Sequence, residues 1–161
     1  MWQQSGFLQS DADVQLAMKK LAVLIDDVVL HYKTLSEEVL MHRISPGKWS
    51  VKEILGHLID SAVNNLKRFT EIQFLPQPYL VTAYQQNELV VVNNYQDIPV
   101  MHLLHLWTAL NQQVIYVVNN ISGEKLSYPV NPQYDNGEMK SLAWIICDYV
   151  AHIEHHFKRV L

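Results

Sequence analysis

Cysteine is nearly absent from this chain. Only Cys147 occurs among the 161 residues, which excludes an intrachain disulfide framework and any cysteine-rich zinc motif. Its neighbours include Ile145, Ile146 and Tyr149, so we expect the thiol to be a small buried hydrophobic group. If the chain binds a metal ion, other side chains must supply the ligands.

Charged residues and long apolar runs are also scarce. Charged residues make up 17% of the chain and apolar residues 49%, so we expect one well-buried globular domain over residues 1–161. The net charge of −4 and the lack of a Lys/Arg block argue against nucleic-acid binding. The chain has no run of about 18 apolar residues, so we expect no membrane-spanning helix. The first residues lack the pattern of a signal peptide, so a cytoplasmic protein is the default expectation.

Apolar residues recur at helical spacing in four long segments. The pattern predicts helices over residues 11–39, 51–74, 99–121 and 141–161. Ser50 with Glu53 three positions later is a capping box, which marks the start of the second helix. Pro76 and Pro78 mark its end.

The connection that follows the second helix is long. Residues 87–92 are compatible with a short helix or a strand, and we favour the short helix. Residues 124–140 are polar, and the flanks of Asn136-Gly137 fit a small hairpin and a plain loop equally well. Together the segments predict an all-α fold, a four-helix bundle with a long connection between helices 2 and 3.

A histidine cluster lies in the last predicted helix, where His152, His155 and His156 occur close together. At about 100° per residue, His156 falls inside the apolar arc, His152 lies at its edge and His155 points to the polar side. Side chains four residues apart share a helix face, with Cβ atoms about 5–6 Å apart. His152 and His156 can therefore bind one metal ion, as H-x-x-x-H pairs do in zinc enzymes.

A metal ion needs at least one further ligand from another element. The remaining candidates are His57, His102, His105, His31 and His42. His57 stands out because it heads a polar stripe on the second helix, with Ser61, Asn64 and Arg68, beside the apolar face. This stripe is either solvated or lines a cleft between packed helices, where bundles often place their sites. His102 and His105 are equally compatible with packed histidines.

Two blocks of sequence resemble the DinB-like superfamily. They are WSVKEILGHLIDSAVNN, residues 49–65, and DYVAHIEHH, residues 148–156. The superfamily includes YfiT-type metal-dependent hydrolases and the bacillithiol and mycothiol S-transferases. The resemblance spans nearly the whole chain in helix order and is weak over residues 75–99.

The resemblance implies a four-helix bundle with one divalent metal ion held by three histidines. By position these are His57 on the second helix and His152 and His156 on the last. It also implies zinc or nickel as the metal and a homodimer as the assembly. It assigns no role to His155.

Three neutral imidazoles would leave coordination positions open, as in catalytic zinc sites. Such an ion can lower the pKa of water to about 7 or hold a thiol deprotonated. Hydrolysis also needs a general base, and Glu154 projects away from the ligand face, so H-x-E-x-H is not a metalloprotease motif here. Asp60 and Asp148 are candidates to orient an imidazole.

These observations lead to two hypotheses. The first is a metal-dependent enzyme acting on a small molecule, either a hydrolase or an S-transferase for a low-molecular-weight thiol. The missing base slightly favours thiol chemistry. The alternative is a non-catalytic helical bundle, with or without metal, that serves in stress response or binding.

Overall fold

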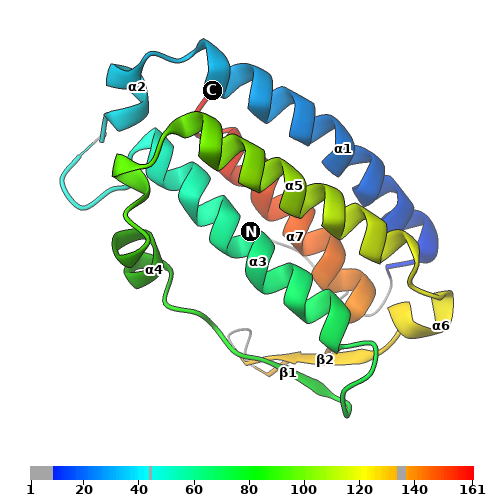
Figure 1. Ribbon diagram of the computed structural model, residues 1–161. Helices are drawn as coiled ribbons and strands as arrows, with labels where there is room; N and C mark the ends of the chain where they lie inside the picture. The colour runs from blue at the N-terminus through cyan, green and yellow to red at the C-terminus, as the bar shows by residue number, and fades with distance from the viewer. Residues whose placement is uncertain (1–8, 44, 134–136) are drawn as a thin grey trace.

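Four long helices form the body of the protein, as predicted (Figure 1). The computed structural model describes residues 9–43, 45–133 and 137–161. The long helices are α1 (Asp11–Thr34), α3 (Val51–Glu71), α5 (Val100–Asn119) and α7 (Leu142–Phe157). The all-α four-helix bundle is therefore confirmed. Within the described residues, no helix has both the length and the apolar character needed to cross a membrane.

The helices form a ring in which α1 packs on α5 and α7, and α3 packs on α5 from the other side. α3 and α7 also lie side by side and complete the ring, but they pack less closely than the other neighbouring pairs. In Figure 1, α3 and α5 run in one direction and α1 and α7 in the other. Because α3 and α5 are parallel neighbours, the chain must return along the bundle between them, which explains the long connection.

This connection contains β1 (Tyr79–Val81), α4 (Gln86–Val92) and the 3₁₀ helix η1 (Tyr95–Asp97). The predicted short helix is confirmed as α4. β1 was not predicted, and it pairs in parallel with β2 (Pro129–Pro132). β2 pairs antiparallel with β3 (Lys140–Ser141), so the flanks of residues 136–137 do pair, although Asn136 lies outside the described residues.

Two of the predicted helices end earlier than expected and are followed by short helices. The predicted helix over 11–39 ends at Thr34, because Ser36 caps a new short helix, α2 (Glu37–Met41), and accepts a hydrogen bond from the Val39 amide. α5 ends at Asn119, and the segment after it forms α6 (Gly123–Leu126).

The interior is filled by large apolar and aromatic side chains from all four long helices. The largest fully buried ones are Trp107, Tyr32, Phe69, Leu21, Leu40, Leu55, Leu58, Ile72, Leu103, Leu104, Leu142 and Ile146. Most of the predicted stripes point inward, since they follow helical periodicity. Cys147 is only partly buried, on the edge of this core.

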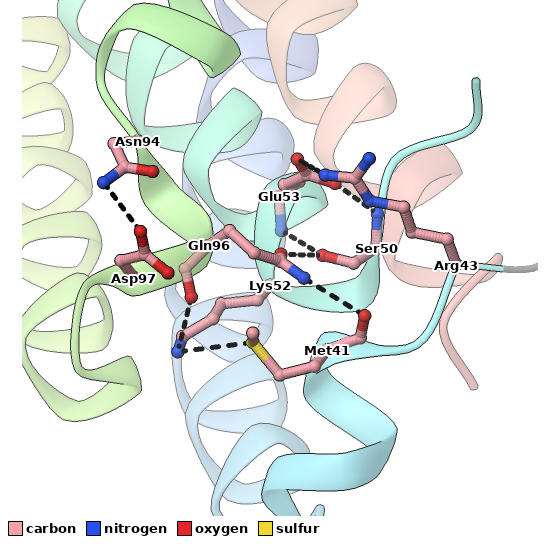
Figure 2. A network of polar contacts seen from close by, with 8 residues as sticks. All are labelled: Met41, Arg43, Ser50, Lys52, Glu53, Asn94, Gln96 and Asp97. Atoms are coloured by element: carbon pink, nitrogen blue, oxygen red, sulfur yellow. Dashed lines mark hydrogen bonds and ion pairs between the residues drawn. The ribbon is translucent and has the colours of Figure 1, made fainter. Parts of the chain in front are cut away.

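Polar contacts fix the beginning of α3 (Figure 2). The predicted capping box forms, since the Ser50 hydroxyl accepts from the Glu53 amide at 3.1 Å and the Glu53 carboxylate accepts from the Ser50 amide at 2.8 Å. The same carboxylate forms an ion pair with Arg43. Trp49, immediately before the cap, is thereby held against the start of the helix.

The long connection is tied to the same end of α3 (Figure 2). The Gln96 side chain accepts from the Ser50 hydroxyl at 2.6 Å and donates to the Met41 carbonyl at 3.1 Å. The buried Lys52 ammonium donates to the Gln96 carbonyl at 3.1 Å. It also pairs with Glu37, at 2.9 Å. Buried polar groups with several partners specify one arrangement of the chain.

A glycine lets η1 approach α3 closely. A Cβ on Gly56 would lie 2.1 Å from the Tyr95 ring, so no larger residue fits there without moving Tyr95. The Tyr95 hydroxyl then donates to the Asp60 carboxylate at 2.6 Å. These contacts hold the connection beside residue 57.

Candidate metal centre

Three histidines from two helices converge in the seam between α3 and α7. His57 comes from α3, and His152 and His156 come from α7. One nitrogen of each lies within 4.8 Å of the others, and the Nε2 atoms of His57 and His152 are 3.0 Å apart. Two nitrogens that share an ion at about 2.0–2.1 Å from each have a similar separation. His57 is fully buried and His156 is 9% exposed.

The three rings form a compact triangle against an indole. The ring centroids of His57 lie 5.2 Å from His152 and 4.8 Å from His156, and those of His152 and His156 are 4.6 Å apart. The Trp49 indole lies 4.7 Å from the His57 ring at an interplanar angle of 31°. Trp49 therefore covers the cluster and limits how His57 can turn.

Burial keeps these imidazoles neutral at pH 7. It lowers the pKa of His57 to about 4, with a smaller contribution from His152. Burial likewise lowers the pKa of His156 to about 3, aided by the neighbouring imidazoles and Arg159. The pKa of His152 is also lowered, first by burial and then by His155. Neutral imidazoles offer lone pairs, which is the form that binds metal ions.

The donor set fits a metal ion. The Nδ1 atoms of His57 and His156 are buried and have no hydrogen-bond partner among the described residues. Buried polar atoms without partners are uncommon. The His57 nitrogen that faces the cluster is Nε2, so the fit to an ion rests on the convergence of the three rings and not on the unpaired Nδ1 of His57. Three neutral imidazoles suit zinc or nickel better than calcium or magnesium, which prefer oxygen ligands.

His155 borders the cluster, with its ring centroid 5.5 Å from that of His156, and the remaining histidines lie apart from it. His155 is exposed, as its place on the helix predicted. His31 has its Nε2 atom 3.0 Å from the Val160 carbonyl oxygen, and His42 is exposed. His102 and His105 are exposed on α5, so the suggestion that they are packed histidines is wrong.

The acidic residues near the cluster differ in orientation. Glu154 forms ion pairs with Lys20 and Lys158, at 2.5 and 3.1 Å, so it faces away from the imidazoles as predicted. Asp60 is buried, and its carboxylate accepts from Tyr95 and Asn93 rather than orienting an imidazole. Burial raises the pKa of Asp60, while these two hydrogen bonds oppose the rise.

A cavity of about 310 Å³ opens beside His152, and we call it the His152 cavity. Its walls come from α3, from α7, from the connection before α4 and from the first residue of α4: Ser61, Asn65, Arg68, Ala83, Tyr84, Gln86, Ile145, Asp148, Tyr149 and His152. The polar stripe of α3 thus lines a cleft at Ser61 and Arg68. Asn64 does not line it, because its side chain donates to the Asp60 carbonyl. Asp148 lies at this cavity and is exposed.

A second cavity, of about 440 Å³, opens beside His156, and we call it the His156 cavity. It is lined by Ser45, Gly47, Lys48, Trp49, Ile54, Asn87, His156 and Arg159. Sequence reasoning did not assign a role to Trp49, Lys48 or Arg159. The signal for Trp49 was present, since it opens the first block that resembles a known family.

Comparison with known proteins agrees with this arrangement. The model of the DinB superfamily matches residues 21–159. A Halalkalibacterium halodurans protein named "putative metal-dependent hydrolase" is 22% identical over 150 residues, covering 93% of this chain and 85% of that protein. An Oceanobacillus iheyensis protein of the same name is 20% identical over 148 residues, covering 92% and 83%.

Two solved structures share the fold. YfiT from Bacillus subtilis, described as a probable metal-dependent hydrolase with an unusual four-helix bundle topology, superposes with a TM-score of 0.87 at 16% identity. That match covers 99% of this chain and 89% of YfiT. An uncharacterised Escherichia coli protein matches with a TM-score of 0.60 at 14% identity, covering 94% and 92%.

Proposed function

The chain belongs to the DinB superfamily, and on that basis we propose that it is a metal-dependent enzyme whose divalent ion is held by His57, His152 and His156. The observation that carries this proposal is the convergence of three neutral imidazoles from α3 and α7, two of them buried and that of His152 half-buried. Zinc and nickel are the ions that this donor set favours. A small molecule is the substrate class that the adjoining cavities can accommodate.

Three neutral imidazoles would hold a divalent ion, which would supply the chemistry of lowering the pKa of a bound water or thiol. The protein's own residues would prepare the site for that chemistry. The apolar surroundings exclude water from His57, and Trp49 restricts the imidazole plane. The polar clasp between Ser50, Gln96 and Lys52 holds the start of α3, and with it the position of Trp49.

We favour hydrolysis, because both curated relatives carry the name of putative metal-dependent hydrolases. Hydrolysis needs a group that accepts a proton from the attacking water. Asp148 is the carboxylate that lines the His152 cavity, so it is our candidate for this role. Glu154 is unsuited to it, because it faces Lys20 and Lys158.

Transfer of a low-molecular-weight thiol to an electrophile is the second candidate. Two cavities, one lined by His152 and one by His156, support it, since a transfer reaction must hold two reactants at once. The absence of a carboxylate from the cluster itself, within the described residues, also suits a reaction in which no general base is needed.

Metal analysis of the full-length protein tests the site. We expect about one divalent ion per chain after exposure to zinc or nickel and removal of the excess. His57→Ala should weaken binding by at least about 100-fold, since even residues that only orient a ligand contribute about 10–100-fold. His155→Ala is the matched control, because it removes an exposed histidine of α7 and should leave the ion in place.

Failure of the wild-type protein to bind zinc, nickel or manganese would refute the metal site. Equal loss in His57→Ala and His155→Ala would also count against it. With the ion bound, ester and amide substrates assay hydrolysis, and a thiol with an electrophilic acceptor assays transfer. An ion without either activity would favour the non-catalytic metal-binding bundle. The homodimer implied by the family resemblance stays a prediction, which light scattering of the purified protein tests.

A further inference from the structure

The two cavities beside the histidine cluster differ in charge. In the His152 cavity, the cation Arg68 shares the wall with the carboxylate of Asp148. In the His156 cavity, the charged wall residues are two cations, Lys48 and Arg159, and no carboxylate from the described residues lines it. The His156 cavity therefore presents a net positive wall directly beside a candidate metal ligand.

The cations of the His156 cavity also differ from others near them. Lys158 pairs with Glu154, and Lys52 pairs with Glu37. In the part of the chain that the structure describes, Lys48 and Arg159 form no ion pair with a carboxylate. Their charges are available to a ligand, because no acidic side chain has to be displaced first.

Backbone hydrogen bonds hold the two turns that carry Lys48 and Arg159, which both line this cavity. The Arg159 amide donates to the His156 carbonyl at 3.1 Å in the turn that ends α7. The Lys48 amide donates to the Ser45 carbonyl at 3.1 Å, in a turn that passes through Gly47 with a φ of +78°. Glycine adopts this conformation without strain, so the turn that presents Lys48 depends on Gly47.

From this juxtaposition we propose that the His156 cavity binds an oxyanionic group of the substrate, a carboxylate or a phosphate, through Lys48 and Arg159. The inference rests on the proposed function, because it places the reacting part of that substrate at the histidine cluster. A guanidinium forms paired hydrogen bonds with carboxylates and phosphates, and an ammonium adds a second charge. Trp49 supplies an apolar wall between the oxyanion and His57.

Titration of the isotope-labelled full-length protein tests this inference. Inorganic phosphate and succinate are the two oxyanion probes, and dimethyl succinate is the uncharged counterpart of the second. We expect both oxyanions to shift the backbone amide signals of Gly47, Lys48 and Arg159, in the metal-free and in the zinc-loaded protein. The neutral ester should leave these signals in place. A stronger response to phosphate or to succinate identifies which oxyanion the cavity prefers.

Charge-removing variants then assign the binding groups. Arg159→Met and Lys48→Met should each weaken oxyanion binding by about tenfold or more, as loss of a hydrogen bond to a charged group does. Lys158→Met removes the same charge one residue away, outside the cavity, and should change binding by less than about twofold because exposed charges are screened.

Three results would overturn the assignment. The first is that neither the metal-free nor the zinc-loaded protein binds an oxyanion. The second is that Lys158→Met weakens binding as much as Arg159→Met does. The third is that only the zinc-loaded protein binds and that neither Lys48→Met nor Arg159→Met changes its affinity. The zinc content of the same samples separates this inference from the proposed function. Zinc bound without oxyanion binding removes the inference alone, whereas no zinc bound removes the proposed metal site.

Discussion

Two faces of α3 are both buried, but burial has opposite effects on stability at the two. One face carries Leu55, Leu58 and Ala62, all with at most 1% exposure, and its burial stabilises the bundle. The other carries His57, Ser61 and Asn65, which are almost as well buried but polar. Burial of His57 lowers its pKa and leaves one ring nitrogen without a partner, so this face costs stability.

The two faces of α3 should therefore have different roles, one in stability and the other in ion binding. The tight packing of α3 on α5 holds the fold, and the sparser seam between α3 and α7 leaves room for imidazoles and cavities. The apolar face should therefore govern stability with little effect on the ion. The polar face should govern ion binding, and its effect on stability should depend on pH.

Among single substitutions at constant pH, the largest expected effect is on the apolar face. Leu58→Ala should lower the free energy of unfolding by about 2–5 kcal/mol, because it leaves a cavity in a fully buried site. Val63→Ala is the control on the same helix, since Val63 is 51% exposed and should change stability by less than about 0.5 kcal/mol. Urea unfolding of the zinc-loaded proteins measures both.

Both variants should keep about one ion per chain while folded. Loss of the ion from folded Leu58→Ala would show that the two faces are not separable. Equal destabilisation by Leu58→Ala and Val63→Ala would show that the apolar face does not dominate stability.

The next effect is the pH dependence of the metal-free protein. The pKa of His57 is about 4 and that of His156 about 3 in the folded protein, below the ordinary value of 6.5. Between these values the unfolded chain binds more protons, so the free energy of unfolding falls as pH falls from 6.5 towards 4. The slope is up to about 1.4 kcal/mol per pH unit for each histidine.

Denaturant titrations of metal-free protein between pH 7.5 and about 4 measure this slope. His156→Gln removes one of the titrating groups and should flatten the decline, while Leu58→Ala should lower stability at every pH without changing its slope. A decline of the same steepness in the wild type and in His156→Gln would contradict the prediction.

Local patterns predicted the fold well, because its helices depend on periodicity and caps. The Ser50–Glu53 capping box and the stripes of the long helices are properties of neighbouring residues. The end of α1 was misplaced, because Ser36 offers the backbone an alternative that apolar spacing does not reveal. β1 was missed, because its partner β2 lies about fifty residues away in the sequence.

The site was less accessible to local reasoning. Spacing alone paired His152 with His156 but left five histidines open as the third ligand. The polar stripe of the second helix then favoured His57, and the family resemblance selected it. The cavities depend on how α3 and α7 are aligned, which no local pattern encodes. Lys48 and Arg159 therefore read as ordinary surface cations until the fold brought them to one wall.

The smallest expected effect concerns Glu154, which lies between two candidate ligands in sequence but points away from them in space. Glu154→Gln removes ion pairs with Lys20 and Lys158. All three side chains are partly or largely exposed, so the free energy of unfolding should fall by less than about 1 kcal/mol.

The same variant should bind zinc with unchanged stoichiometry and keep whatever activity the wild type has. A glutamate acting as the general base of an H-E-x-x-H site would instead be needed for turnover. Glu154→Gln with intact zinc but abolished activity would therefore place this carboxylate in the reaction, against its orientation here. Intact activity would show that Glu154 takes no part in the reaction, although His152 and His156 flank it in the sequence.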